Sequence, residues 1–470
     1  MAEKTFDFGM IGLGVMGRNL LLNIADHGFS IAGLDTDEKK VTALKMEAAG
    51  KNVDGTTEMK RFISMVKTPR RIMMLVPAGA PVDAVLKEAL PLLQNGDVMI
   101  DGGNSHFSDT DRRIKQLEPT GIQFMGVGIS GGEEGARYGP SIMPGGTVDG
   151  YEKMKPIFEA IAAKVNGESC VTHIGPGSAG HYTKMVHNGI EYGFMQVISE
   201  TYDVMKRGLQ MTNEQMLDVY TSWNEGELQS FLLGITARIF SITDDETHEK
   251  LLLDHILDSA AQKGTGKWTS QSAMDLQVPT PVIDLAVSMR DLTAMKQERT
   301  AASKKLPFTR PELNLNSTLI LSSLKDAAYF SLITIYAQGM HLLKAASDKM
   351  KYNIVPQHIA RIWRGGCIIR SALLEQIMEA YQRNPSLSNL ITDDFFSGEL
   401  LKRREAIQQA IEFAMRRQIP VPALGASLAY VDAYRSEWLP ANLIQAQRDF
   451  FGSHTYQRTD KEGTFHTKWD

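Results

Sequence analysis

Apolar and polar positions change their pattern once along the chain, near residue 180. Before that point, short apolar runs recur at intervals that leave room for a helix between them, which is typical of a parallel sheet with crossover helices. The segment 18–27 has helical periodicity and is closed by Gly28. We therefore predict an α/β Rossmann-like N-terminal domain with buried strands at 6–11, 30–34, 71–76, 98–100 and 123–127.

Beyond about residue 181 these runs give way to long segments with a period of 3.6 residues, which predict a large all-α C-terminal domain. A short predicted helix at 439–451 precedes a polar end that is too small to bury a core. We expect three parts, at 1–178, 179–438 and 439–470. The predicted helices of the second part are 181–208, 212–222, 226–240, 317–346, 357–383 and 400–418.

Two glycine-bearing segments interrupt the helical pattern. Residues 262–268, Gln-Lys-Gly-Thr-Gly-Lys-Trp, are interpreted as a basic loop after a helix. Its amides and Lys263 can hold a phosphate, although the P-loop spacing is absent and a plain helix-ending loop is the alternative. Residues 363–371, Trp-Arg-Gly-Gly-Cys-Ile-Ile-Arg-Ser, place glycines in a helical context, so we assign them to close helix packing.

The composition is that of an ordinary soluble globular protein, with 43% hydrophobic and 22% charged residues among 470. A formal net charge of −5 argues against a nucleic-acid partner. Cys170 and Cys367 stand far apart, so we expect free thiols in a reducing compartment. No apolar run is judged long enough to span a membrane, and a strand starting at Phe6 leaves no room for a signal peptide. We expect a cytoplasmic protein without a membrane partner.

A glycine turn, Gly12-Leu13-Gly14-Val15-Met16-Gly17, follows the first predicted strand and opens a helix. A GxGxxG motif alone is a weak signal, but here a second apolar strand follows and ends at Asp35, with Thr36 next to it. The glycines let a pyrophosphate approach a helix N-terminus, and the acid can hold ribose hydroxyls. A glycine turn without a ligand is the alternative. We predict a dinucleotide site.

Three later strands follow, and two of them, 98–100 and 123–127, end in glycine-rich turns. Ligands of open parallel sheets bind at the carboxyl ends of the strands, so these turns face one crevice. Taken alone, the residues of each turn are more simply explained as ordinary turn residues. Together the turns favour a substrate pocket beside the dinucleotide. We place Val76, Pro77, Ala78 and Asn104 beside the cofactor, and Asn104, Ser130, Gly131 and Gly132 in the substrate pocket.

The segment 180–193 carries the predicted chemistry. Lys184, His187, Asn188 and Glu191 are spaced at i, i+3, i+4 and i+7, and therefore share one face of a helix. The amine and the carboxylate stand about 10 Å apart along the axis, which is too far for an ion pair but suits the two ends of a small molecule. A solvated helix face is the alternative. Because apolar residues flank the face, we favour a catalytic site.

The C-terminal segment holds residues that are unusual for a disordered tail. Phe465, His466 and Trp469 are explained if the tail docks on another surface, such as a second subunit. Arg448 and His454 can supply positive charge to an anion. A solvated tail is the alternative.

Seven motifs, in order, resemble those of the decarboxylating 6-phosphogluconate dehydrogenase family over nearly the whole chain. The resemblance implies oxidative decarboxylation of 6-phosphogluconate to ribulose 5-phosphate and CO2 with reduction of NAD or NADP, in the pentose phosphate pathway and gluconate utilisation. It also implies a homodimer whose C-terminal tail passes through the partner subunit. The motifs are GLGVMGRNL (12–20), IDGGNS (100–105), SGGEEGARYGPSIMPGG (130–146), KMVHNGIEYG (184–193), QKGTGKWT (262–269), WRGGCIIRS (363–371) and LPANLIQAQRDFFGSHTY (439–456).

Carried over by position, Lys184 resembles the family's general base for the C3 hydroxyl, and Glu191 its general acid for C1 of the enediol. The base needs a lowered pKa, through burial or nearby positive charge. No metal is implied, because a 3-keto acid loses CO2 once its keto oxygen is hydrogen-bonded. The other implied contacts are Asn104, Ser130, Gly131 and Gly132 to the carboxylate end, His187 and Asn188 to the keto oxygen, and Tyr192, Lys263, Thr265, Arg290 and the partner's Arg448 and His454 to the phosphate.

Two positions depart from the family pattern. NADP-using members carry Asn-Arg-Thr after the second strand, whereas this chain has Asp35-Thr36-Asp37. A carboxylate suits ribose hydroxyls and repels a 2′-phosphate, so we predict a preference for NAD, with Lys39 and Lys40 as possible substitutes for the arginine. The second departure is Pro77, where the family often has lysine; it removes one positive charge.

Two other functions fit parts of the sequence. A non-decarboxylating β-hydroxyacid dehydrogenase shares the glycine motif and a lysine helix, but it lacks the 262–268 loop and the long tail. A dinucleotide-binding sensor without turnover would have lost Lys184 or Glu191, and both are present. Release of CO2 from 6-phosphogluconate separates all three.

Overall fold

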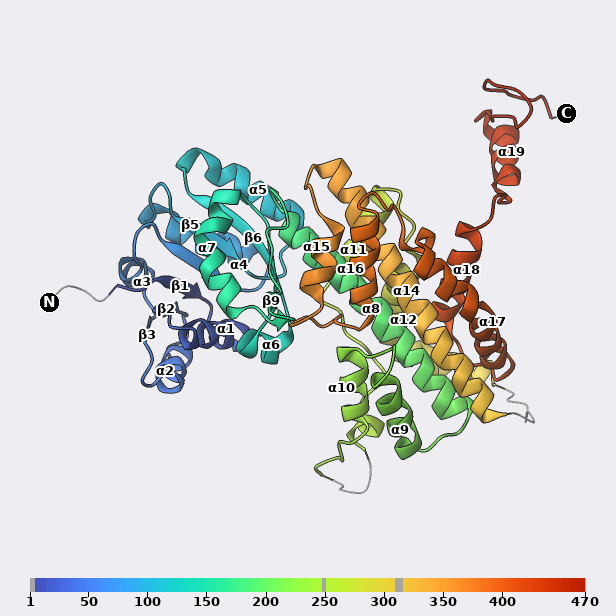
Figure 1. The fold of residues 1–470 in the computed structure, drawn as a ribbon, viewed down its shortest axis with the longest axis horizontal. Helices are drawn as coiled ribbons and strands as arrows, with labels where there is room; N and C mark the ends of the chain where they lie inside the picture. Colours follow the sequence, from blue (N-terminus) through green and yellow to red (C-terminus); the bar gives the residue numbers. More distant parts are fainter. Residues whose placement is uncertain (1–4, 247–250, 309–315, 470) are drawn as a thin grey trace. The chain divides into compact units, whose positions relative to one another are not determined.

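The computed structural model describes residues 5–246, 251–308 and 316–469. The chain divides into two compact units, Met1–Ser427 and Leu428–Asp470, and each is described by itself. The first unit contains a sheet domain followed by a helical domain, and the second consists of the end of a helix, one further helix and the C-terminal segment (Figure 1).

The N-terminal sheet has seven strands in the order β3-β2-β1-β4-β5-β6-β7. All neighbouring strands are parallel except β7, which runs antiparallel to β6. The order reverses direction between β1 and β4, and such switch points of parallel sheets bind ligands. The strands are β1 Phe8–Ile11, β2 Ile31–Leu34, β3 Val53–Thr56, β4 Arg71–Met74, β5 Val98–Asp101, β6 Gln123–Ser130 and β7 Ser141–Pro144.

Helices cover both faces of this sheet because its strands are apolar on both sides. Alternate residues of β1 and β4 enter different cores: Phe8, Met10 and Met73 join one, while Ile72 and Met74 join the other. A parallel sheet buried in this way is stabilised mainly by apolar burial. The sheet domain also holds the small hairpin β8 Lys164–Val165 and β9 Glu168–Ser169; its helices are α1 Val15–Asp26, α2 Glu38–Glu47, α3 Met59–Met65, α4 Ala80–Ala89, α5 Phe107–Leu117, α6 Gly132–Tyr138 and α7 Val148–Ile161.

The helical domain is built around two long buried helices, α8 and α14, which pack against each other. Helices α11 and α12 also pack on α8, and α17 packs on α14 (Figure 1). The helices are α8 Ala179–Asp203, α9 Asn213–Asn224, α10 Phe231–Ile239, α11 Thr265–Asp275, α12 Pro281–Ala294, α13 Lys296–Lys305, α14 Ser317–Met350, α15 Pro356–Trp363, α16 Leu373–Arg383, α17 Asp394–Arg416, α18 Pro422–Tyr434 and, in the second unit, α19 Ala441–Gly452.

The predicted class, an α/β Rossmann-like domain followed by a large helical domain, is confirmed, but several element predictions were wrong. The predicted helix 357–383 is two helices, because the chain leaves the helical path between Trp363 and Leu373 and Gly366 has a φ of +62°. The predicted helix 226–240 begins only at Phe231. The basic loop 262–268 does not follow a helix; it leads into α11, which starts at Thr265.

The expectation that no segment has membrane-spanning length was wrong for α14. Among the described residues, Ser317–Met350 is the one helix long and apolar enough by length and composition to cross a membrane. Of its most apolar 18 residues 61% are buried, and α8 and α17 pack against the helix. Its apolar length is therefore that of a core helix surrounded by other helices.

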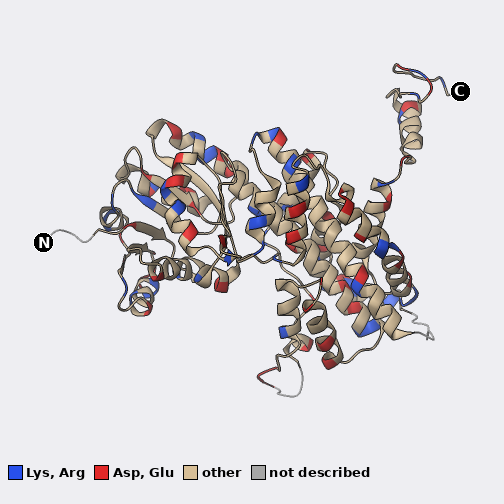
Figure 2. Cartoon of the chain, viewed as in Figure 1, with Lys and Arg blue, Asp and Glu red and all other residues tan. Residues whose placement is uncertain are grey.

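Charged side chains of both signs are interspersed over the helices of the first unit (Figure 2). Lysine and arginine number 50 against 55 aspartate and glutamate.

Candidate active site

Close backbone approach shapes the glycine turn between β1 and α1. Gly12 has a φ of +91°, and a Cβ there would lie 2.5 Å from the carbonyl oxygen of Leu75. A Cβ at Gly17 would lie 1.9 Å from the carbonyl oxygen of Gly12. Gly14, in contrast, faces open space and precedes α1, whose first N–H groups no side chain caps. The turn therefore offers space and free donors to an anionic group, as a dinucleotide pyrophosphate requires.

Asp35 ties the glycine turn to the end of β2. Its Oδ2 accepts a hydrogen bond from the backbone N–H of Leu13 at 2.8 Å, and its Oδ1 accepts one from Asp37 at 3.0 Å. Burial alone raises the pKa of Asp35, but these bonds and Lys40, whose Nζ lies 3.3 Å from Oδ2, hold it below its ordinary value. Asp35 is therefore an ionised acceptor beside the glycine turn. Thr36 is exposed beside it.

A cavity of about 670 Å³ adjoins the glycine turn. It collects residues from the ends of β4 and β5 and from the start of α11, which the sequence separates by nearly 200 positions. The predicted cofactor residues among its lining are Met16, Val76, Pro77, Ala78 and Asn104, and the predicted substrate residues are Lys263 and Thr265. The two predicted sites therefore meet in one space.

Helix α8 runs past the carboxyl end of β6 with almost no clearance. A Cβ on Gly180 would lie 2.3 Å from the carbonyl oxygens of both Gly126 and Met143, and a Cβ on Gly128 would lie 2.5 Å from the Cβ of Lys184. Only glycine permits this approach. As a result Lys184 borders a small cavity that shares Asn104, Thr265 and Trp268 with the larger one.

His187 is the centre of a buried polar cluster. Its Nε2 lies 3.0 Å from Oγ of Ser130 and 2.9 Å from Sγ of Cys367. Its Nδ1 lies 3.0 Å from Oδ1 of Asn188 and 3.4 Å from Nζ of Lys184. A carbonyl oxygen at Nδ1 assigns the proton to that nitrogen, so Nε2 accepts from the hydroxyl and the thiol. Burial lowers the pKa of His187 well below its ordinary value, which keeps the imidazole neutral.

The pKa values of Lys184 and Glu191 are shifted in opposite directions. Burial lowers the pKa of Lys184, with Glu191 and Cys367 opposing the change. Burial raises the pKa of Glu191, with Lys184 and Arg290 opposing it. Removing both groups from water favours a neutral amine and a neutral carboxyl. A base and an acid in these states, on one helix face beside a cavity, suit general acid–base catalysis.

Tyr192, Arg290 and the start of α11 form a second polar region along α8. The guanidinium carbon of Arg290 lies 3.5 Å from the ring centroid of Tyr192. A Cβ on Gly266 would lie 2.5 Å from that ring, and Oγ1 of Thr269 donates to the carbonyl oxygen of Met185 at 2.8 Å. The tight contact brings the start of α11, with Lys263 and Thr265, beside α8.

Gly131, which joins β6 to α6, has a φ of +130°, and Gly132, the first residue of α6, has a φ of +63°. A Cβ on Gly131 would lie 2.7 Å from the carbonyl oxygen of Gly366. The predicted contacts of the partner tail, Arg448 and His454, belong to the second unit, where both side chains are exposed.

Cys367 has no predicted role from the sequence, because the whole segment 363–371 is predicted to serve close helix packing. The structure places the Cys367 thiol against His187, and the backbone N–H of Ile368 donates to Oγ of Ser130 at 3.3 Å. The glycines before Cys367 gave a usable signal, since they mark a break in a helical pattern.

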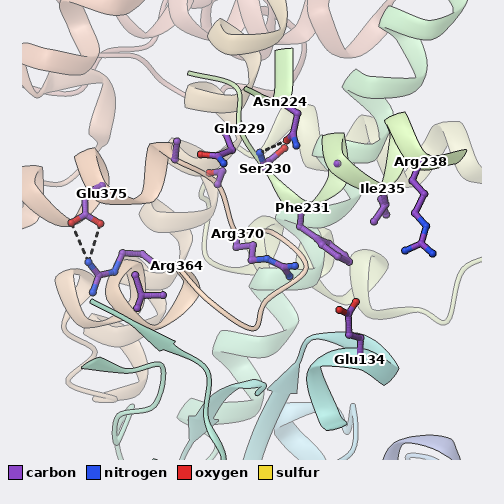
Figure 3. A pocket seen from close by; sticks show the side chains of 14 residues that line it. Glu134, Asn224, Gln229, Ser230, Phe231, Ile235, Arg238, Arg364, Arg370 and Glu375 are labelled. Carbon is purple, nitrogen blue, oxygen red and sulfur yellow. Dashed lines mark hydrogen bonds and ion pairs between the residues drawn. The ribbon is translucent and has the colours of Figure 1, made fainter. Parts of the chain in front are cut away.

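Another cavity, of about 580 Å³, lies between α6, the α9–α10 connection and the segment 364–375 (Figure 3). Arg364 forms an ion pair with Glu375 at 2.9 Å, and Arg370 stacks on Phe231, with its guanidinium carbon 4.0 Å from the ring centroid. This cavity shares no lining residue with the two described above, so it is separate from the predicted active site. Within the described ranges no group of three or more His, Cys, Asp or Glu residues is placed to hold a metal ion.

An uncapped glycine turn, an ionised acid at the end of β2, and a buried amine on a cavity that shares residues with the one at the turn together define a dinucleotide-dependent dehydrogenase. Family models give the particular family. The model for the NAD binding domain of 6-phosphogluconate dehydrogenase matches residues 7–175, and the model for the 6-phosphogluconate dehydrogenase C-terminal domain matches residues 180–469. The chain belongs to the 6-phosphogluconate dehydrogenase family.

Individual relatives agree with this assignment. The NADP(+)-dependent, decarboxylating 6-phosphogluconate dehydrogenase of Bacillus subtilis is 51% identical over 98% of both chains. Decarboxylating 6-phosphogluconate dehydrogenase 1 of Saccharomyces cerevisiae is 49% identical over 96% of this chain and 92% of its own. A solved Plasmodium falciparum 6-phosphogluconate dehydrogenase superposes with a TM-score of 0.95 at 42% identity, covering 98% of this chain and all of that one. These full-length matches favour a decarboxylating enzyme over the β-hydroxyacid dehydrogenase and sensor alternatives.

Proposed function

We propose that the protein oxidises and decarboxylates 6-phosphogluconate to ribulose 5-phosphate and CO2, in the oxidative pentose phosphate pathway, with a nicotinamide dinucleotide as hydride acceptor. The observation that carries the proposal is the buried amine of Lys184 on the wall where the dinucleotide cavity meets the polar face of α8. Cytoplasmic localisation, as for a soluble metabolic enzyme, is part of the proposal.

Lys184 acts first as the general base. Its neutral amine accepts the proton of the C3 hydroxyl while the hydride leaves C3. Acceptance of that hydride is the chemistry that the nicotinamide supplies when it is bound. The resulting 3-keto acid loses CO2 when its keto oxygen is hydrogen-bonded, and Lys184, now an ammonium, can donate that bond together with Asn188. Glu191 then protonates C1 of the enediol, and its raised pKa keeps the required proton available.

The remaining polar groups hold the two ends of the substrate. Neutral His187 keeps Asn188 oriented through its Nδ1–H. Asn104, Ser130, Gly131 and Gly132 are assigned to the carboxylate end, since they end β5 and β6. Charge at the phosphate end comes from Lys263 and Arg290, and charge-assisted bonds to phosphate are strong and geometrically specific. The phosphate contacts are Tyr192, Lys263, Thr265 and Arg290, completed by the partner's Arg448 and the partner's His454.

The reaction itself is tested by mixing the protein with 6-phosphogluconate labelled at C1 and either NAD or NADP. We expect labelled CO2 and reduced nicotinamide in equal amounts, with ribulose 5-phosphate as the sugar product. Reduced nicotinamide without CO2 would replace the proposal with a simple hydroxyacid dehydrogenase. No turnover with either cofactor would favour the non-catalytic sensor.

We further propose that the enzyme prefers NAD. Asp35 is an ionised carboxylate at the end of β2, where a 2′-phosphate would lie, and Thr36 supplies no guanidinium. Lys40 partly offsets the negative charge, because its Nζ lies 3.3 Å from the carboxylate. The balance of one carboxylate and one ammonium favours two ribose hydroxyls over a dianionic phosphate.

Replacing Asp35 with asparagine and Thr36 with arginine should move the preference toward NADP. The change removes a repelling charge and adds a charge-assisted donor, so the NADP:NAD ratio of kcat/KM should rise by roughly 10- to 100-fold. Initial rates with both cofactors measure the ratio. Lys40→Ala is the matched control: a loss confined to NADP in that variant would show that Lys40 already replaces the arginine, contrary to the predicted preference.

We also propose the division at 1–178, 179–438 and 439–470, with the last part lying on the partner of a homodimer. The support is the exposure of large apolar side chains on the second unit, including Leu443, Ile444, Phe450 and Phe451. Apolar surface of this extent on a helix of twelve residues is typical of a surface that another chain covers.

Mixed dimers test the exchange. In the first dimer, a chain that carries both Lys184→Ala and Arg448→Ala pairs with a wild-type chain. The only working site is that of the wild-type chain, and it receives the altered tail. Its KM for 6-phosphogluconate should rise by roughly 10- to 100-fold. In the reciprocal dimer, a Lys184→Ala chain pairs with an Arg448→Ala chain, and the working site receives an intact tail, so its KM should stay normal. The opposite pattern would place Arg448 in the site of its own chain.

A further inference from the structure

Asp449 is the only buried residue of α19, although the helix is otherwise exposed. An ionised acid inside a small unit is costly unless its oxygens are satisfied. Here four donors point at it. Oδ1 accepts from the backbone N–H of Thr455 and from Nδ1 of His466, both at 2.9 Å. Oδ2 accepts from the backbone N–H of Thr467 at 3.1 Å and from Nε1 of Trp469 at 2.9 Å.

These bonds fold the end of the chain back onto α19. Tyr456 and Phe465 pair through two reciprocal backbone hydrogen bonds of 2.8 Å, which brings residues 466–469 beside the helix. Burial raises the pKa of the Asp449 carboxyl, but the donors from His466, Thr467 and Trp469 outweigh it and hold the pKa well below its usual range. The carboxylate therefore stays ionised, and four residues of the tail are tied to one side chain.

The residues proposed to bind phosphate flank this anchor. Arg448 immediately precedes Asp449, and His454 immediately precedes Thr455, whose N–H Asp449 accepts. Ser453 and Thr455, on either side of His454, have φ values of +50° and +60°, a sparsely populated region for residues with side chains. Such conformations persist only when neighbouring contacts hold them.

The turn at residues 452–455 also fixes the imidazole of His454. A Cβ on Gly452 would lie 2.7 Å from the ring, and the rings of Phe451 and His454 meet edge-on with centroids 6.0 Å apart. Arg448 is held in turn by Gln445, whose Oε1 accepts from the guanidinium at 3.0 Å. Arg448 and His454 are thus both exposed on a turn whose inside is organised by one carboxylate.

We propose that Asp449 is a positioning residue that fixes Arg448 and His454 before they meet the substrate phosphate in the partner subunit. The inference rests on the proposed tail exchange. Ordering two long or polar side chains on binding costs affinity, and a preformed turn removes much of that cost. Asp449 touches neither substrate nor cofactor; it acts through the two residues that flank the turn.

The test replaces Asp449 with asparagine, which keeps the shape but exchanges one acceptor for an NH2 donor facing other donors. We expect the KM for 6-phosphogluconate to rise about tenfold, with kcat within about twofold of wild type and an unchanged Kd for the dinucleotide. Asp460→Asn is the matched control in the same tail, because Asp460 is exposed and paired only with Arg458 among the described residues. Its KM should be that of wild type.

A mutant cycle distinguishes positioning of the two side chains from general stability of the tail. It combines Asp449→Asn with the double variant Arg448→Ala, His454→Ala. In that background Asp449→Asn should leave the KM unchanged, because nothing remains to be positioned. An equal tenfold rise there would overturn the proposal. If Arg448→Ala, His454→Ala alone leaves the KM normal, the proposed phosphate role of the tail fails instead, and the two failures are therefore distinct.

Trp469→Phe provides a milder variant in case Asp449→Asn does not assemble. It removes only the indole donor, and we expect a KM about threefold above wild type with normal sedimentation as a dimer. A wild-type KM in Trp469→Phe and in any assembled Asp449→Asn protein would overturn the proposal.

Discussion

Lys184→Ala should abolish turnover of 6-phosphogluconate while the protein still binds its dinucleotide. The variant removes the amine that accepts the C3 proton, and general bases contribute roughly 10²- to 10⁴-fold to rate, so kcat should fall by about 10³-fold or more. Because Lys184 borders the smaller cavity and does not line the glycine turn, the dinucleotide Kd should stay unchanged. Single-turnover formation of reduced nicotinamide and titration of cofactor binding measure the two quantities.

Added primary amines provide the decisive control. Methylamine is small enough to occupy the space of the deleted side chain, so it should restore part of the rate to Lys184→Ala in proportion to its free-base concentration. Lys206→Ala is the matched control and should have a normal rate. Lys206 donates a hydrogen bond to Asp254 and lines neither of the two cavities at the predicted site. Near-normal turnover of Lys184→Ala without any amine would place the base elsewhere.

The pH dependence follows from the direction of the shift. Lys184 must be a free amine to act as a base, and the free amine predominates above its pKa. Burial lowers that pKa from 10.5, so the base becomes available at lower pH than an exposed lysine would allow. In the amine-rescued variant, the corresponding limb of the kcat/KM profile should move and follow the pKa of the added amine instead of that of Lys184.

Glu191→Gln should cause the second large loss, about 10²-fold or more in kcat, since the amide cannot donate the proton that C1 requires. The Kd for 6-phosphogluconate should change little, because the phosphate contacts are intact. The acid form exists below its pKa, and burial raises that pKa from 4.5, so the proton remains available at higher pH than for an exposed glutamate. Activity that depends on this proton is lost as pH rises through the raised value.

Stereochemistry at C1 gives a sharper readout for Glu191. In deuterated water the wild-type enzyme should place deuterium at one of the two hydrogen positions of C1, since the acid delivers it from one face. Glu191→Gln should give a mixture, because solvent then protonates the enediol from either face. Retained rate together with retained stereochemistry would show that another group supplies the proton.

Local patterns determined much of the sheet domain and the face of α8. Strand β1, the glycine turn and the following helix were predictable because backbone conformation there depends on nearby residues, as the positive φ of Gly12 shows. The shared face of Lys184, His187, Asn188 and Glu191 was predictable because helical spacing alone sets it. The failures lie where packing overrides spacing: the pattern at 357–383 is helical, yet the chain breaks at Gly366 so that Cys367 can reach His187.

The sequence by itself determined the class of fold, the dinucleotide turn and the family, since each depends on local periodicity or on motifs in order. Only the tertiary structure decided which groups are buried and which atoms they meet. The opposite pKa shifts of Lys184 and Glu191 come from the helices and strands packed around α8. The four donors of Asp449 come from residues 6 to 20 positions away. Desolvation and hydrogen-bond geometry depend on such contacts between distant parts of the chain, which no local pattern of residues specifies.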